Sequence, residues 1–131
     1  MVLDASAVLE LVLATPLGHA LAERVDWPAG SLHAPELLDV EVCSVLRRYA
    51  LTGALSPQDG EQALIDLIRL PLHRYPHHDL LPRAWQLRDT HTAYDGVYVA
   101  LAENLGAPLI TTDARLARSH GHQARIELVE A

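Results

Sequence analysis

The sequence predicts an α/β fold of three layers, in which a short central parallel sheet is covered by helices on both faces. Short apolar segments of strand length alternate with longer segments that carry apolar residues at helical spacing. Such alternation is typical of parallel sheets built from strand–helix–strand units. The linkers are short and no repeat or low-complexity segment divides the chain, so we expect residues 1–131 to form one domain.

The strands and helices are expected in a regular order along the chain. The expected strands are residues 1–3, 31–33, 72–75, 108–111 and 126–129. The expected helices are residues 7–14, 17–25, 36–51, one that opens at 56–57, 79–88, 94–105 and 113–120. Pro16 separates the first two helices, and Pro35 is a helix-start proline for the third. Gly53 and Gly106 are expected as helix ends.

Composition excludes several classes of site. The single cysteine, Cys43, excludes a disulfide framework and a CxxC site, and its apolar surroundings predict a small core residue. All ten basic residues are arginines. Without lysine, the chain has neither a phosphate-loop lysine nor a Schiff-base lysine.

The start of the chain and its charge bear on location and partners. Asp4 and Glu10 interrupt the apolar start, no basic segment precedes it, and no apolar run approaches the ~20 residues of a membrane span. We therefore expect a cytoplasmic protein with no membrane contact. The net charge of −7 disfavours a broad basic surface for nucleic acid. A nuclease could carry this charge if divalent cations offset its acids locally.

Two acids follow expected strands directly. Asp4 comes after residues 1–3, and Asp113 comes after residues 108–111. Ligands of open parallel sheets bind beyond the carboxyl ends of the strands, so both acids could face one crevice. Each acid also precedes a helix, where aspartate is a favoured N-cap. Both interpretations stay open for each residue.

Two further acids lie on helix faces that should point inward. Glu41 has Leu37, Leu38 and Val45 as helical neighbours, and a glutamate in such a place needs a partner or a metal. A buried arginine is the structural alternative for Glu41. Asp39, by contrast, is expected to face solvent.

Asp95 lies in the first turn of its expected helix, where its charge would suit the helix dipole. It shares a face with Tyr98, Val99 and Ala102, and Thr92 is the expected N-cap instead.

The four carboxylates are more informative together than singly. Mg²⁺ takes oxygen ligands, commonly one or two carboxylates with water and substrate phosphates. A carboxylate cluster without His or Cys partners suits Mg²⁺, with Mn²⁺ as a substitute, better than Zn²⁺. Such an ion activates water and stabilises charge on phosphoryl oxygens, which would let an acidic protein cut an acidic polymer.

These residues also carry a family resemblance. The segments "VLDASA", "APELLDVEVCSVLRR" and "TAYDGVYVALAENLGAPLITTDARLA" resemble PIN domains, specifically VapC-type toxins of bacterial toxin–antitoxin pairs, over nearly the whole chain. The resemblance implies a PIN-like three-layer fold and a Mg²⁺-dependent endoribonuclease. It also implies an RNA substrate, a cognate antitoxin and a homodimer. The family's acidic positions correspond to Asp4, Glu41, Asp95 and Asp113.

The expected roles follow from the chemistry of a metal site. Asp4 and Asp95 are the preferred metal ligands, directly or through water. Glu41 and Asp113 complete the acidic ring and orient metal-bound water or hold a second ion. Ser6 and Thr112 are candidate supporting hydroxyls, although either could simply cap a helix.

Three other positions carry polar groups that bear on the site. Arg115 is a candidate phosphate contact, with a solvated helix arginine as the alternative. Thr90 stands where the family often has asparagine, which affects any substrate contact made there. The cluster "PHHD" at residues 76–79 is expected to be a loop before a helix and not a metal site.

Other functions remain to be weighed. An aspartyl phosphatase needs a second aspartate where Ser6 stands, and a receiver domain needs a lysine that the chain lacks. A catalytically silent PIN fold that only binds RNA or a partner remains the alternative. The apolar residues Leu51, Leu55, Leu64 and Ile68 are expected to be incompletely covered and to mark an interface.

Overall fold

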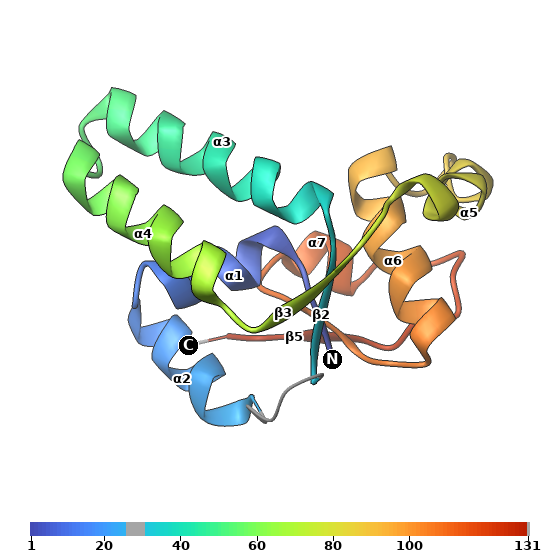
Figure 1. Cartoon of the computed structure of the whole chain (residues 1–131). Coiled ribbons are helices and arrows are strands. Elements are labelled where there is room, and N and C mark those ends of the chain that lie inside the picture. The colour runs from blue at the N-terminus through green and yellow to red at the C-terminus, as the bar shows by residue number, and fades with distance from the viewer. Residues whose placement is uncertain (26–30, 131) are drawn as a thin grey trace.

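A computed structural model describes residues 1–25 and 31–130. Their strands form one sheet in the order β3-β2-β1-β4-β5, in which every neighbouring pair is parallel (Figure 1). The strands are β1 (Val2–Leu3), β2 (Leu32–Pro35), β3 (Leu72–Tyr75), β4 (Leu109–Thr111) and β5 (Ile126–Leu128). The expected α/β fold with a short parallel sheet is confirmed.

Helices cover both faces of this sheet. They are α1 (Ala5–Val12), α2 (Pro16–Arg24), α3 (Leu37–Thr52), α4 (Pro57–Arg69), α5 (Leu81–Gln86), α6 (Ala93–Leu105) and α7 (Ala114–Ala117), with a 3₁₀ turn at His78–Leu80. Helix α6 packs against β1, β2 and β4, whereas α1 packs against β4 and against α2, α3 and α4. Figure 1 shows α1 to α4 grouped on one side and α5 and α6 on the other.

Local sequence signals set most helix ends. The side chains of Thr15, Ser56 and Thr92 accept hydrogen bonds from backbone amides in the first turns of α2, α4 and α6. Gly53 and Gly106 end α3 and α6 with φ values of 81° and 59°, a conformation that favours glycine. The expected cap at Thr92 and the expected ends at both glycines are therefore confirmed.

The core lies on both faces of the central strand. Leu3 of β1 and Ile110 of β4 are completely buried, and Tyr98 of α6 is 2% exposed. On the other side, Leu38 and Val42 form part of the stripe that α3 buries. Because β1 is covered on both faces, residues at its carboxyl end are held by rigid surroundings.

Several expected boundaries are wrong. The first helix spans Ala5–Val12 and not residues 7–14, because Asp4 is its N-cap. Pro35 ends β2 and does not begin a helix, because the chain stays paired with β3 through Tyr75. The expected helix 79–88 is divided, because Pro82 lies in the first turn of α5 and so favours a helix start there. The last expected helix stops at Ala117, three residues before His120.

One expectation on α3 is wrong, and another is met only in part. Cys43 is exposed, because the buried stripe follows Leu38, Val42 and Leu46, and Cys43 lies just beside it. Asp39 is not simply solvated, because its Oδ2 accepts a 2.7 Å hydrogen bond from Arg74 Nε. Its Oδ1 is buried and has no hydrogen-bond partner among the residues that the structure describes.

The surface residues expected at an interface divide into two kinds. Leu51 and Ile68 are 69% and 75% exposed, as expected. Leu55 and Leu64 are half-buried and pack against the core, so the structure covers them more than expected.

Within residues 1–25 and 31–130, no single helix is long and apolar enough to cross a membrane. The pair α1 and α2 meets the length and composition only when both helices are taken together, across a bend of 107°.

An ion pair between α5 and α6 gives a first testable prediction. Glu103 accepts hydrogen bonds of 2.8 and 3.0 Å from Arg83, and of 2.8 Å from the backbone amide of Gln123. The Arg83 hydrogen bond lowers the pKa of Glu103. We expect Glu103→Gln to reduce the free energy of unfolding by about 1–3 kcal/mol at neutral pH.

The pH dependence of this loss has a definite sign. A lowered folded-state pKa stabilises the fold above the ordinary value of 4.5, and this contribution disappears as the pH falls below that value. Urea unfolding at several pH values should therefore show the difference between parent and variant shrinking on acidification. If the difference in free energy of unfolding stayed the same at every pH, packing of the Glu103 side chain and not its charge would account for the stabilisation. Glu61→Gln, on the exposed face of α4, is the matched control.

Candidate active site

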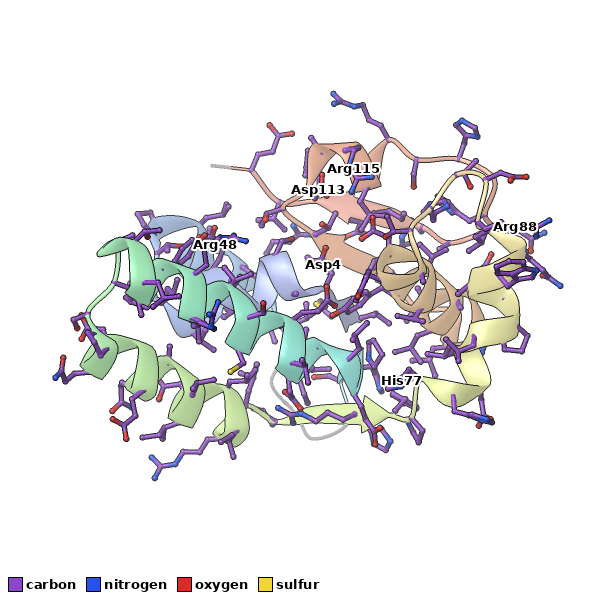
Figure 2. The ribbon with its side chains drawn as sticks, turned by 90° about the horizontal axis from the view of Figure 1, so that it is seen from above. Asp4, Arg48, His77, Arg88, Asp113 and Arg115 are labelled. Carbon is purple, nitrogen blue, oxygen red and sulfur yellow. The ribbon has the colours of Figure 1, made fainter. Side chains whose placement is uncertain are left out.

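The candidate site lies at the carboxyl end of β1, where the order of the sheet reverses. The next strand in sequence, β2, pairs with one edge of β1, and β4 pairs with the other. Asp4 follows β1 and Asp113 follows shortly after β4, so both acids lie at this end of the sheet. Figure 2 shows Asp4, Asp113 and Arg115 in the same part of the molecule. Both aspartates also cap helices, α1 and α7, so the two interpretations are compatible.

Asp4 is buried and held in place by three donors. Its Oδ1 accepts hydrogen bonds from the Ser6 hydroxyl at 2.6 Å and from the Ala7 amide at 3.0 Å. Its Oδ2 accepts one from the Thr111 hydroxyl at 2.5 Å. With 6% of its surface exposed, Asp4 has almost no rotational freedom.

Glu41 is held by a tyrosine and not by the arginine considered as its alternative. The buried Tyr98 hydroxyl of α6 donates a 2.7 Å hydrogen bond to Glu41 Oε1. This contact joins α3 to α6 across the end of the sheet. It leaves Glu41 Oε2 without a hydrogen-bond donor among the residues that the structure describes.

Asp95 and Asp113 share one basic side chain. Arg115 NH2 lies 3.1 Å from Asp95 Oδ2 and 3.4 Å from Asp113 Oδ2. The Arg115 side chain is 68% exposed, whereas those of Asp95 and Asp113 are 21% and 36% exposed, so the arginine lies on the solvent side of this contact. This pairing was not expected from the sequence, because Arg115 is twenty residues from Asp95.

The electrostatics bring three of the acids into one neighbourhood. Burial raises the pKa of Asp4, and the negative charge of Asp95 raises it further, against the opposing hydrogen bonds. Burial also raises the pKa of Glu41, with additional contributions from Asp95 and Asp4. Tyr98 has a raised pKa from burial and from Glu41, so its hydroxyl remains a donor. Asp113 joins this group through its shared contact with Arg115.

The arrangement bears on metal binding in two ways. The donors are carboxylate and hydroxyl oxygens, the type that Mg²⁺ and Mn²⁺ prefer. In residues 1–25 and 31–130, no group of three His, Cys, Asp or Glu side chains is placed to hold one metal ion. A hydrated Mg²⁺ needs only one or two carboxylates, and Asp4 and Asp95, whose negative charges act on each other, are carboxylates of the kind that it takes.

Thr111 is a site residue that sequence reasoning missed. Its hydroxyl donates to Asp4 and accepts from the Asp113 amide at 3.0 Å, so it links two of the acids. The candidate supporting residue Ser6 does contact Asp4, while Thr112 supplies its backbone amide to Ser6 Oγ at 3.0 Å. All three residues of β4 are buried, so no alternation marks Thr111, and its place at the end of that apolar run, just before Asp113, is the signal that could have found it.

The remaining predicted positions lie beside the acids or away from them. Thr90 lines a cavity of about 310 Å³ with Asp95 and Arg115, and its hydroxyl lies 2.8 Å from His91 Nδ1. A second cavity of about 540 Å³ lies on the Glu41 side. In the "PHHD" segment, His78 and Asp79 are exposed side chains 3.3 Å apart.

Comparisons with known proteins give the family. The PIN-domain family matches residues 1–120. Ribonuclease VapC12 of Mycobacterium tuberculosis is 50% identical over 129 residues, which cover 98% of each chain.

Two solved structures share the fold. A Pyrobaculum aerophilum protein, PAE2754, has a TM-score of 0.69 at 21% identity and covers 95% of this chain and 87% of its own. VapC20 of M. tuberculosis, described as a sarcin–ricin loop cleaving toxin, has a TM-score of 0.66 at 16% identity and covers 88% and 92%. All four acids lie within residues 1–120, which the PIN-domain family matches. The chain therefore belongs to the PIN-domain family as a VapC-type ribonuclease.

Proposed function

We propose that this protein is a Mg²⁺-dependent endoribonuclease that acts as the toxin of a toxin–antitoxin pair. Family membership supports the ribonuclease activity. The observation that carries the finer proposal is the convergence of Asp4, Glu41 and Asp95 at the carboxyl end of β1, where their charges act on one another. Repulsion of this kind is relieved by a bound cation.

The contacts of each acid suggest its role in catalysis. Asp4, fixed by Ser6 and Thr111, and Asp95 would hold Mg²⁺, which supplies activation of water and stabilisation of negative charge on the phosphate. Glu41 would orient the attacking water and accept its proton at Oε2, the oxygen that Tyr98 does not contact.

Asp113 and Arg115, which contact each other, would act beside Asp95. Asp113 would complete the acidic ring from the start of α7. Arg115 would turn from the acids to a phosphate of RNA, since its side chain is exposed and long.

The partners belong to the same proposal. A VapC-type toxin implies an antitoxin, and we propose that the antitoxin places an arginine or lysine among the four acids. Arg115 supports this proposal, because its own guanidinium group lies between Asp95 and Asp113 and shows that a basic group has room there. A homodimer that uses the exposed Leu51 and Ile68 and a cytoplasmic location stay predictions.

A catalytically silent PIN fold that only binds RNA or a protein is the second candidate. It is disfavoured because all four acidic positions are occupied by acids, and Asp4 and Glu41 are held by dedicated donors. A silent domain has no need to retain buried carboxylates that repel one another.

Glu41→Gln tests the proposed function with little risk to the fold. A glutamine Oε1 still accepts the Tyr98 hydrogen bond, whereas it accepts no proton from water. RNA ends sequenced after brief expression should show new cleavage sites for the parent protein and none for Glu41→Gln. Equal sets of new ends would refute catalysis by these acids, and no new ends for either protein would favour the silent fold.

Thr111→Val removes a hydroxyl while keeping nearly the same shape. Asp4 Oδ2 then loses its donor and the Asp113 amide loses its acceptor. We expect cleavage and Mg²⁺ affinity to fall by about 10- to 100-fold, as is typical when a residue that orients a metal ligand is replaced. Thr111→Ser should restore both, which would separate the hydroxyl from packing. A Thr111→Val protein with parental Mg²⁺ affinity would contradict the role given to Thr111.

A further inference from the structure

A groove of about 540 Å³ begins at the acids and runs along α3. Its walls come from α1, α3 and the start of α6, and Ser6 and Glu41 form the end that belongs to the candidate active site. The rest of the lining is mostly apolar, with residues such as Leu9, Val40 and Val45. This size and lining are typical of sites for small organic groups.

Two tyrosines and one arginine line this groove. Tyr94 is 59% exposed and lines the groove together with Glu41. Tyr94 has no hydrogen-bond or ring partner among the residues that the structure describes. Tyr49 adds a second ring, and the Arg48 guanidinium lies 5.7 Å from the centre of that ring.

The position of Arg48 on α3 follows from the helix period. Glu41 and Arg48 are two turns apart on one face, which places them about 10 Å apart along the helix axis. Ser44 and Val45 lie on the turn between them and also line the groove. Figure 2 shows Arg48 on α3 to one side of Asp4. Its neighbour Arg47 lines a different cavity, against α4.

We propose that this groove binds a nucleotide of single-stranded RNA next to the bond that is cut, with Tyr94 stacking on the base and Arg48 contacting a phosphate. The inference rests on the proposed function and adds the residues that position the substrate. Specific RNA recognition commonly uses unstacked bases on aromatic side chains, with arginine at the backbone.

The lining favours RNA over the face of a protein helix. Arg48 is the only basic residue in the lining and stands in a chain of net charge −7, so an anionic ligand gains most from its position. The Ser44 hydroxyl adds a hydrogen-bonding group to the floor of the groove. The groove is also lined by Glu41, so a strand with its scissile phosphate at the acids brings a neighbouring nucleotide within reach of it.

The test compares four substitutions at exposed positions. Tyr94→Ala removes the ring and Tyr94→Phe keeps it. Arg48→Ala removes the charge in the groove, and Arg47→Ala removes an adjacent charge outside it. The probe is a fluorescein-labelled single-stranded RNA of mixed sequence. Its cleavage by the parent and the variants gives KM and kcat. Fluorescence anisotropy, measured in the presence of a chelator to prevent cleavage, gives the dissociation constant and its salt dependence.

We expect Tyr94→Ala to raise KM and the dissociation constant about tenfold, with the change in KM and not in kcat, and Tyr94→Phe to restore most of the loss. Arg48→Ala should weaken RNA binding severalfold. It should also reduce, by about one, the steepness with which the logarithm of the binding constant falls with the logarithm of salt concentration. Arg47→Ala should stay within twofold of the parent.

Parental RNA affinity in both Tyr94→Ala and Arg48→Ala would overturn the inference, even where cleavage continues. If these variants kept RNA affinity but lost self-association in gel filtration, the groove would be an interface with a second copy of the chain. That result would also overturn the RNA-binding inference. If the parent cleaved no RNA, the proposed function would fail. The anisotropy series would then still decide whether the groove binds RNA.

Discussion

Asp95→Asn is expected to reduce RNA cleavage by about 10²- to 10³-fold while leaving the protein folded. Asp95 is one of the two proposed Mg²⁺ ligands, and its charge acts on both Asp4 and Glu41. An asparagine keeps the size of the side chain but removes the negative charge that would hold a cation. A measured rate with one labelled RNA at saturating Mg²⁺ gives the effect directly.

The stability of the metal-free variant provides the control on this result. Loss of the Asp95 charge relieves repulsion with Asp4 and Glu41, whereas loss of the pair with Arg115 costs at most about 1 kcal/mol because that arginine is exposed. The two effects oppose each other, so the free energy of unfolding should change by no more than about 1 kcal/mol.

Mg²⁺ should raise the melting temperature of the parent and leave that of Asp95→Asn nearly unchanged. Asp79→Asn is the matched substitution at an exposed site. If Asp95→Asn unfolded the metal-free protein, Asp95 would be a structural partner of Arg115 and not a ligand.

Gly18→Ala is expected to have the largest effect on stability. A Cβ at residue 18 of α2 would lie 2.0 Å from the backbone oxygen of Glu10 in α1 and 2.5 Å from its carbonyl carbon. A backbone carbonyl cannot rotate away, so the sharp bend between α1 and α2 would have to open. We expect a loss of at least about 3 kcal/mol, at the upper end of overpacking costs, measured by urea unfolding.

Gly60→Ala is the matched control for this prediction. It lies inside α4, where a Cβ would meet only a Leu55 methyl group at an ordinary distance of 3.6 Å. The helix should gain up to about 1 kcal/mol from alanine. Similar stabilities for Gly18→Ala and Gly60→Ala would mean that the two helices can separate without cost, contrary to the packing described above.

The strand-end acids could be found from the sequence because local patterns determine their positions. Short apolar runs that precede Asp4 and Asp113 predict strand ends, and parallel strands bring such ends together. The spacing of apolar residues around Glu41 predicts an inward face on α3. Each of these inferences uses a period or a boundary that can be read within about ten residues of the chain.

The partners of those acids depend on contacts between distant segments. Tyr98 meets Glu41 across 57 residues, and Thr111 meets Asp4 across 107 residues. No periodicity encodes such pairs. Arg115 was recognised as a candidate phosphate contact, but its pairing with Asp95 depends on how the ends of α6 and α7 meet. The prediction that Cys43 is a core residue is wrong because Cys43 lies one position beyond Val42, and one position is enough to leave the buried stripe of α3.

Mg²⁺ dependence of RNA cleavage is the most direct test of the four-acid site. Protein treated with a chelator and then freed of it should be mixed with one labelled RNA and increasing Mg²⁺, and the rate measured at each concentration. Cleavage should be absent without metal, rise to saturation with Mg²⁺ and be restored by Mn²⁺. Cleavage at an equal rate in excess chelator, by the parent protein and by Asp95→Asn, would contradict the proposal.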